Sequence, residues 1–186
     1  MTISGSGGGS LDRRRLLAAG LAAGCGVLLS GAHPASAQGV RRRLGFHNIH
    51  TGEDLRATCW EGGHYLPDSL REIDFVLRDF RTGEVHAIDP QLLDLLHRIC
   101  AALDYHGPIN VISGYRCPAT NAMLAAHTTG VAKNSFHLRG MAVDIRLPGQ
   151  RLEAVRDAAL LIGRGGVGYY PSSDFVHVDT GPLRRW

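Results

Sequence analysis

Two histidines and an aspartate in the C-terminal part of the chain constrain the fold most. His137 and Asp144 stand seven positions apart, and His177 follows later in the chain. Two imidazoles and a carboxylate form a ligand set that zinc accepts, with a fourth position left for water. A fold that brings these three side chains together therefore predicts a hydrolytic metal site.

Short strands are expected to carry two of these ligands. Residues 141–146 alternate as a strand, and residues 175–179 predict the last strand. Because side chains alternate between the two faces of a strand, two neighbouring strands can direct Asp144 and His177 at one metal. His137 is expected to reach in from the loop that precedes its strand.

The remaining segments predict helices and strands in mixed order. Asp68 or Ser69 is expected to cap a helix that ends at Thr82 and Gly83, and Asp89 caps the next helix with Pro90 at its first position. Further helices are expected at 118–126 and 152–162. Strands are expected at 44–50 and 55–60, as a hairpin, and at 109–113 and 167–170.

Longer motifs around these residues carry a family resemblance. They are Asn48-Ile-His-Thr-Gly-Glu53, Val111-Ile-Ser-Gly-Tyr-Arg116, Ser135-x-His137-x-x-Gly140-x-Ala142-x-Asp144, Gly165-Gly-Val-Gly-Tyr-Tyr-Pro171, Phe175-Val-His-Val-Asp-Thr-Gly-Pro182 and Arg185-Trp186. The set resembles the LAS metallopeptidases, which include lysostaphin, the D-Ala-D-Ala metallopeptidases and Hedgehog-like domains. The full string is similar to the murein endopeptidase K branch across the whole mature chain.

This resemblance implies both a fold and an activity. It implies an α+β fold with a small antiparallel sheet and flanking helices, one zinc ion, and cleavage of peptidoglycan cross-links at the bond from D-alanine to meso-diaminopimelate. Arg116 is implied to hold the substrate carbonyl and stabilise the oxyanion. Ser135 is implied to donate hydrogen bonds to substrate or to support a ligand, and Tyr115, Tyr169 and Tyr170 are expected to line a groove for the substrate.

A metal-activated water needs a base, and two carboxylates compete for that role. Asp174 stands three residues before His177, where the D-Ala-D-Ala metallopeptidases carry the glutamate of their E-x-x-H motif. It can serve only if residues 172–174 are still a turn, since an odd separation points it away in a regular strand. Asp179 lies on the same strand face as His177 and could instead orient His177 or Arg116. Asp174 is the preferred base.

Three rival functions stay open on the sequence alone. A D-Ala-D-Ala carboxypeptidase or dipeptidase would use the same metal site but needs a basic pocket, and only Arg116, Lys133 and Arg139 are cations near the motifs. A zinc domain without catalysis could bind cell wall or a partner protein. A cysteine nucleophile with a histidine base would leave Asp144 unexplained.

The first 37 residues predict an export signal. Asp12-Arg-Arg-Arg-Leu-Leu17 resembles a twin-arginine signal, and the apolar stretch 16–29 is too short to span a membrane comfortably. Ala35-Ser-Ala37 supplies a cleavage site, which leaves a zinc peptidase domain at 38–186. The protein is expected in the periplasm, with membrane contact only during export. Lipidation at Cys25 is the minor alternative.

The charge and the cysteines of the mature chain narrow the remaining options. The formal charge of +3 falls to +1 when three arginines and one aspartate leave with the signal, so nucleic acid is not an expected partner. Cys59, Cys100 and Cys117 remain, and their odd number leaves at least one unpaired. A bridge between Cys100 and Cys117 is one option in an oxidising compartment.

Overall fold

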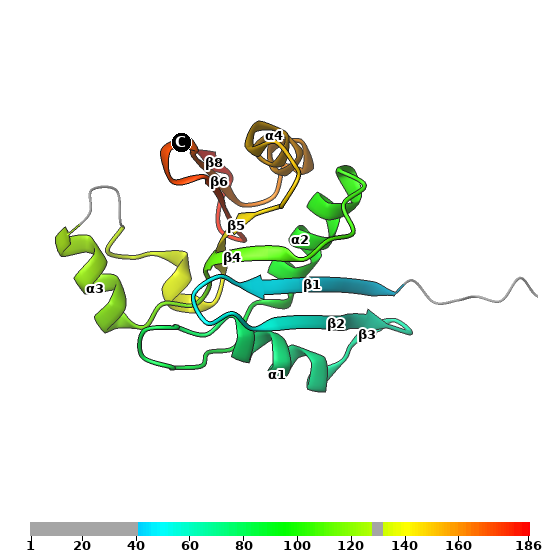
Figure 1. Ribbon diagram of the computed structural model, residues 1–186, viewed down its shortest axis with the longest axis horizontal. Coiled ribbons are helices and arrows are strands. Elements are labelled where there is room, and N and C mark those ends of the chain that lie inside the picture. Colours follow the sequence, from blue (N-terminus) through cyan, green and yellow to red (C-terminus); the bar gives the residue numbers. More distant parts are fainter. Residues whose placement is uncertain (1–40, 128–131) are drawn as a thin grey trace, which may run out of the picture. The chain divides into compact units, whose positions relative to one another are not determined.

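A mixed sheet of eight strands carries the fold. The computed structural model describes residues 41–127 and 132–186. The strands are β1 Arg42–Asn48, β2 Asp54–Glu61, β3 His64–Tyr65, β4 Ile109–Ser113, β5 Ala142–Arg146, β6 Gly166–Tyr170, β7 Phe175–Asp179 and β8 Arg184–Arg185. Their order across the sheet is β3-β2-β1-β4-β5-β7-β6-β8 (Figure 1).

The expectation of a small antiparallel sheet was wrong in its details, although the α+β class holds. β1 pairs with β4 in parallel, and so does β6 with β8, whereas the other neighbours are antiparallel. The parallel pairing of β1 with β4 arises because two helices lie between them in the chain, and a parallel pair requires such a crossover connection. The β1–β2 hairpin was predicted, and β6 and β7 form a second antiparallel hairpin.

Four α-helices surround the sheet. They are α1 Pro67–Val76, α2 Pro90–Ala102, α3 Pro118–His127 and α4 Leu152–Ile162, and two short 3-10 turns, η1 Phe136–Arg139 and η2 Pro171–Ser173, lie next to the sheet. Asp89 caps α2 as predicted, because its carboxylate accepts a hydrogen bond from the Gln91 amide, and Pro90 opens the helix. α2 packs against β1 and α4, while α1 packs against β2.

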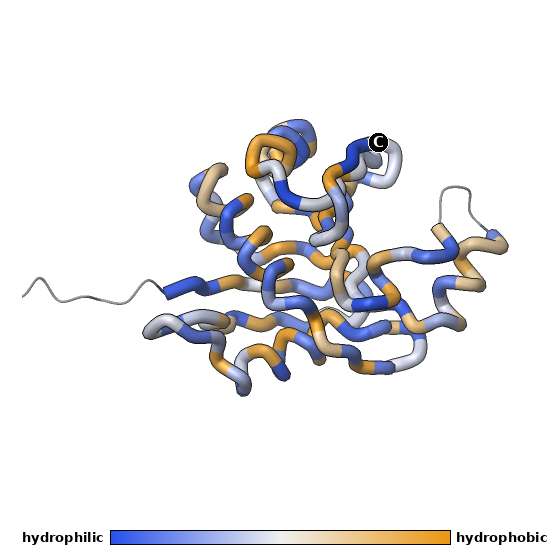
Figure 2. Tube along the Cα trace, turned by 180° about the vertical axis from the view of Figure 1, so that it is seen from behind, coloured by the Kyte–Doolittle hydropathy of each residue, from blue (hydrophilic) through white to orange (hydrophobic). Residues whose placement is uncertain are grey.

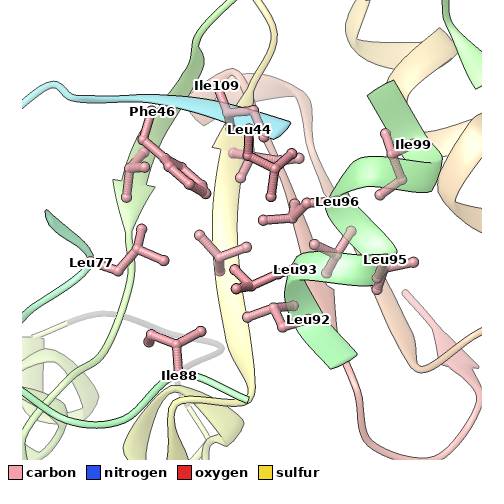
Figure 3. Packing of buried hydrophobic residues seen from close by; sticks show 14 of the residues in the cluster. Leu44, Phe46, Leu77, Ile88, Leu92, Leu93, Leu95, Leu96, Ile99 and Ile109 are labelled. Atoms are coloured by element: carbon pink, nitrogen blue, oxygen red, sulfur yellow. The ribbon is translucent and has the colours of Figure 1, made fainter. Parts of the chain in front are cut away.

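The core lies between the sheet and the helices. Buried and less buried residues alternate along β1, and Figure 2 shows the matching alternation in hydropathy. Figure 3 shows leucines of α2 pointing toward side chains of the sheet and of the segment after α1. Among the fully buried members are Phe46, Leu77, Leu92, Leu93, Leu96, Ile99 and Ile109.

Helix α1 is shorter than the sequence predicted. Its N-cap is Leu66 with Pro67 at the first position, and it ends at Val76 rather than near Thr82. The chain leaves the helix at Leu77, whose carbonyl oxygen accepts a hydrogen bond from the Tyr115 amide at 2.8 Å. The apolar side chain of Leu77 is buried outside the helix, so its hydrophobicity did not mark the helix end.

Two glycines permit close contacts that position the site. A Cβ at Gly114 would lie 2.3 Å from the Leu77 carbonyl oxygen, so a side chain there would push β4 away from the segment after α1. Gly140 adopts φ +64°, and a Cβ there would lie 2.2 Å from the Ala87 carbonyl oxygen. Both contacts favour glycine, which also tolerates the positive φ.

Several predictions from the sequence concern cysteines or the N-terminal region. Cys59, Cys100 and Cys117 are buried and free, so the suggested bridge between Cys100 and Cys117 is absent. The predicted signal at 1–37, with its paired arginines, its cleavage site and Cys25, lies outside the described residues. Within residues 41–127 and 132–186, no helix is both long and apolar enough to cross a membrane.

Candidate metal centre

The three predicted ligands come together where β5, β7 and η1 meet. Asp144 on β5 and His177 on β7 are direct partners across the two antiparallel strands. His137 belongs to η1, which begins at Ser135 and ends at Gly140 just before β5. All three side chains are buried, and one ligand atom from each lies within 4.8 Å of the others.

The facing atoms are Nε2 of His137, Nδ1 of His177 and Oδ1 of Asp144. The two imidazole nitrogens are 3.2 Å apart, and Oδ1 lies 2.8 Å from His177 and 3.3 Å from His137. These separations resemble the edges of a small coordination polyhedron and leave one side open toward a cavity. The group is the candidate metal centre.

Partners on the far side of each imidazole fix its tautomer. Nδ1 of His137 lies 2.7 Å from the Gly114 carbonyl oxygen, which only accepts, so this nitrogen carries the proton. Nε2 of His177 lies 3.0 Å from a carboxylate oxygen of Asp179 and donates to it. The atoms that face the centre are then three acceptors, which repel one another unless a cation lies among them. The donor set therefore fits a divalent metal such as zinc.

The pKa shifts of the three candidate ligands also favour a metal ion at this position. Burial alone would raise the pKa of Asp144, but His137 and His177 outweigh it and hold that pKa well below its ordinary value. Burial lowers the pKa of His137 by more than Asp144 raises it, so this imidazole stays neutral. For His177, hydrogen bonds to Asp144 and Asp179 overcome burial and raise the pKa. The carboxylates that attract a proton to His177 attract a metal ion equally.

Arg116 lies at the cavity with its guanidinium against the centre. Its Nη2 donates to Oδ2 of Asp144 at 2.6 Å, and its Nε donates to the Ser113 hydroxyl at 2.8 Å. The oxygen of Asp144 that faces away from the ligand cluster is therefore held by a positive charge. The Arg116 amide donates to the His137 carbonyl oxygen at 3.2 Å, which ties the arginine to the turn that carries a ligand.

The two residues expected to contact substrate lie in different places. Ser135 lines the cavity, and its hydroxyl accepts a hydrogen bond from the His137 amide at 3.4 Å as the N-cap of η1. Tyr115 is buried in the core, where its hydroxyl donates to Glu84 at 2.7 Å and its ring stacks on His86. The structure therefore does not support Tyr115 as a groove residue. Tyr170, which was also expected in the groove, does line the cavity.

The two candidate bases differ sharply in their surroundings. Asp174 lies in a turn with φ +53°, as the sequence argument required, but its exposed carboxylate forms an ion pair with Arg146 at 2.7 Å and does not line the cavity. Asp179 is fully buried and accepts hydrogen bonds from the Gly166 and Gly181 amides as well as from His177. Its bonds overcome the effect of burial and lower its pKa. This geometry favours Asp179 as a positioning residue for His177 and gives no support to Asp174 as the base.

The cavity at the centre has a volume of about 560 Å³. Residues far apart in the sequence line it. His50, Phe136, Phe175 and Trp186 lie within the motifs quoted above, although no role was assigned to them, whereas Arg81 and Arg184 were not singled out by sequence analysis. No spacing connects Arg81 to the ligand motifs, since only the folded chain brings it to the same cavity as β5 and β7.

Comparisons with known proteins identify the family of the chain. The family model Peptidase_M15_2, described as peptidoglycan L,D-endopeptidase MepK, matches residues 35–186. The peptidoglycan L,D-endopeptidase MepK of Escherichia coli (strain K12) is 42% identical over 176 residues, which cover 94% of this chain and 97% of the relative. The probable peptidoglycan L,D-endopeptidase MepK of Haemophilus influenzae is 41% identical over 175 residues, 94% of each chain.

The relatives' names also bear on the bond that is cut. They specify an L,D bond, whereas the sequence analysis expected the bond that follows D-alanine. The carbonyl group of the expected bond comes from D-alanine, which is a D-configured residue. The expectation of a peptidoglycan endopeptidase therefore agrees with the relatives, and the particular cross-link that was expected differs from their description.

Proposed function

The chain belongs to the Peptidase_M15_2 family of MepK-type peptidoglycan endopeptidases, and on this premise we propose that it hydrolyses L,D peptide cross-links of peptidoglycan. One zinc ion would be held by His137, Asp144 and His177. The observation that carries the proposal is the convergence of three buried acceptor atoms, each in a side chain whose other polar atom is already bonded.

The residues around the centre would divide the work. A bound zinc ion would act as the Lewis acid that polarises the scissile carbonyl and activates water. Asp179 keeps the Nδ1 lone pair of His177 directed at the metal position. Arg116 braces Asp144 through Nη2, and the rest of its guanidinium faces the cavity, where it can donate to the oxygen that gains negative charge.

A D-Ala-D-Ala carboxypeptidase is the second candidate. That activity requires a cation for the terminal carboxylate of the substrate. The sequence analysis did not identify a basic pocket for it, but the guanidinium of Arg81 lies in the cavity and meets the requirement. The family relationship favours the endopeptidase. Both activities would use the same ligands, so substrates rather than variants distinguish them.

Purified muropeptides test the proposed activity. We expect the chain 38–186, loaded with zinc, to convert a dimer with an L,D cross-link into monomers, as measured by liquid chromatography and mass spectrometry. A chelator should stop the reaction and added zinc should restore it, because the three ligands supply no Lewis acid of their own. Preferential cleavage of a D-Ala to diaminopimelate dimer, or release of D-Ala from a monomer ending in D-Ala-D-Ala, would contradict the L,D assignment.

We propose that residues 1–37 direct the protein to the periplasm by the twin-arginine route. Peptidoglycan is a substrate outside the cytoplasmic membrane, and Arg13 and Arg14 stand before the apolar stretch that such a signal requires. Replacing both arginines by lysine should leave the uncleaved precursor in the cytoplasm, as detected by fractionation and immunoblotting. Unchanged periplasmic delivery of the double variant would indicate another export route.

A further inference from the structure

Three arginines line the cavity, and two of them already have a carboxylate partner. Arg116 bonds to Asp144 at 2.6 Å, and Arg184 bonds to the buried Asp179 at 2.6 Å. Arg81 differs, because its guanidinium has no hydrogen bond or ion pair with any residue in 41–127 or 132–186. Its one side-chain contact of note is with the ring of Phe80, 4.1 Å from the guanidinium carbon.

The backbone that carries Arg81 is held rigidly beside the catalytic arginine. Asp79 is buried, and its Oδ1 accepts a hydrogen bond from the Arg81 amide at 3.0 Å. Its Oδ2 accepts from the amide of Cys117, the residue after Arg116, at 2.9 Å. One buried carboxylate therefore fixes the position of Arg81 relative to Arg116.

Arg81 packs on Phe80, whose ring in turn stacks on the cavity residue His50. Phe80 stacks on His50 with ring centroids 3.7 Å apart and planes 10° apart. Nε2 of His50 donates to the Ile112 carbonyl oxygen at 2.9 Å, which ties the stack to β4. The guanidinium of Arg81 thus lies on a fixed aromatic surface, so less of its freedom is lost when it binds a ligand.

The charge balance of the cavity favours an anionic group near Arg81. Asp144 carries the one side-chain carboxylate among the described residues that line the cavity, and it faces the metal position and Arg116. No negative side chain of the cavity is left to neutralise Arg81. A planar guanidinium recognises a carboxylate through two parallel hydrogen bonds, which makes a substrate carboxylate the matching ligand.

We propose that Arg81 binds a free carboxylate of diaminopimelate and makes the enzyme selective for cross-links in which that carboxylate is not amidated. The inference rests on the proposed cleavage of L,D cross-links. When the amine of such a bond comes from the D-centre of diaminopimelate, the carboxyl group on that centre takes part in no peptide bond. A cross-link between two diaminopimelate residues therefore presents one free carboxylate on each side.

Arg81→Gln tests this assignment with two substrates. The substrates are L,D-cross-linked muropeptide dimers whose diaminopimelate carboxylates are either free or amidated, and the readouts are kcat and KM for the zinc-loaded enzyme. The unchanged enzyme should prefer the free acid. Arg81→Gln should raise KM for the free acid by roughly 10- to 100-fold, the usual worth of a charged hydrogen-bonded contact, and should leave the amidated substrate within about 3-fold.

Two further variants separate the effect of the positive charge from that of the planar guanidinium. Arg98→Gln removes the same charge from an exposed position on α2 that does not line the cavity, and it should change neither substrate. Arg81→Lys keeps the charge but loses the planar fork, so it should retain part of the preference for the free acid.

Other outcomes overturn the assignment. Equal effects of Arg81→Gln on both substrates, or no effect on either, would show that Arg81 does not bind the carboxylate. An unchanged enzyme that cleaves L,D cross-links but ignores amidation would overturn this inference and leave the proposed function standing. An unchanged enzyme that cleaves neither dimer would overturn the proposed function, and the inference with it.

Discussion

Replacing Asp144 by alanine is expected to abolish both zinc binding and turnover. Asp144 supplies the one negative charge among the three facing acceptors, and its other oxygen bonds to Arg116 at 2.6 Å. Without it, two neutral imidazoles remain beside an uncompensated, largely buried guanidinium. We expect zinc per chain to fall to background and cleavage of the L,D-cross-linked dimer to fall by at least roughly 10⁴-fold, since the metal supplies both polarisation and an activated water.

Asp174→Ala is the matched control, and it also tests the base that the sequence favoured. Its carboxylate is exposed and paired with Arg146, and such surface pairs contribute little. Zinc should be retained and turnover should stay within about 3-fold of the unchanged enzyme. A fall of roughly 10²–10⁴-fold with full zinc occupancy would instead identify Asp174 as the general base. Full zinc occupancy in Asp144→Ala would refute the ligand assignment.

Arg116→Lys is expected to have the second largest effect. Lysine keeps the charge but cannot donate to Asp144 and Ser113 while another nitrogen faces the cavity. With saturating zinc, kcat should fall by roughly 10²–10³-fold, the usual cost of losing a donor to the oxyanion, and KM should change little. Zinc affinity should fall by roughly 10- to 100-fold, because the outer oxygen of Asp144 loses its partner.

Arg146→Lys controls for the arginine-to-lysine change. Arg146 lies at the end of β5 and pairs with Asp174, outside the cavity, so neither zinc affinity nor kcat should respond. A large rise in KM with unchanged kcat in Arg116→Lys would show that Arg116 binds the substrate equally in its ground state and is not specific for the transition state.

The parts of the site that could be predicted from sequence are local patterns. Asp144 and His177 were placed on one face of neighbouring strands because alternation has a fixed period, and the structure pairs them directly. Tyr115 lies in the core, where its amide bonds to Leu77 and its hydroxyl to Glu84, and these contacts with a distant segment leave no local pattern in the sequence. Arg81 could not be found, since the buried Asp79 that holds it also bonds to the amide of Cys117, and no sequence spacing records that second contact.

For the fold as well, local features could be predicted from the sequence and long-range contacts could not. The cap of α2 and the β1–β2 hairpin follow from residues close in sequence, and both were predicted, whereas the predicted cap of α1 at Asp68 or Ser69 was wrong. The parallel pairing of β1 with β4 depends on where two helices return the chain, and the early end of α1 depends on a hydrogen bond between Leu77 and Tyr115. Packing decides such long-range contacts, and the local propensities of residues carry no information about it.

The pairing of β5 with β7 bears on when the protein acquires its metal. Asp144 and His177 become neighbours only when these strands pair, so a growing chain cannot assemble the site until β7 has been synthesised. The free energy of zinc binding would then stabilise the finished fold and not its precursors. A protein exported in the folded state would cross the membrane already loaded, and the zinc supply of the cytoplasm would set how much active enzyme reaches the wall.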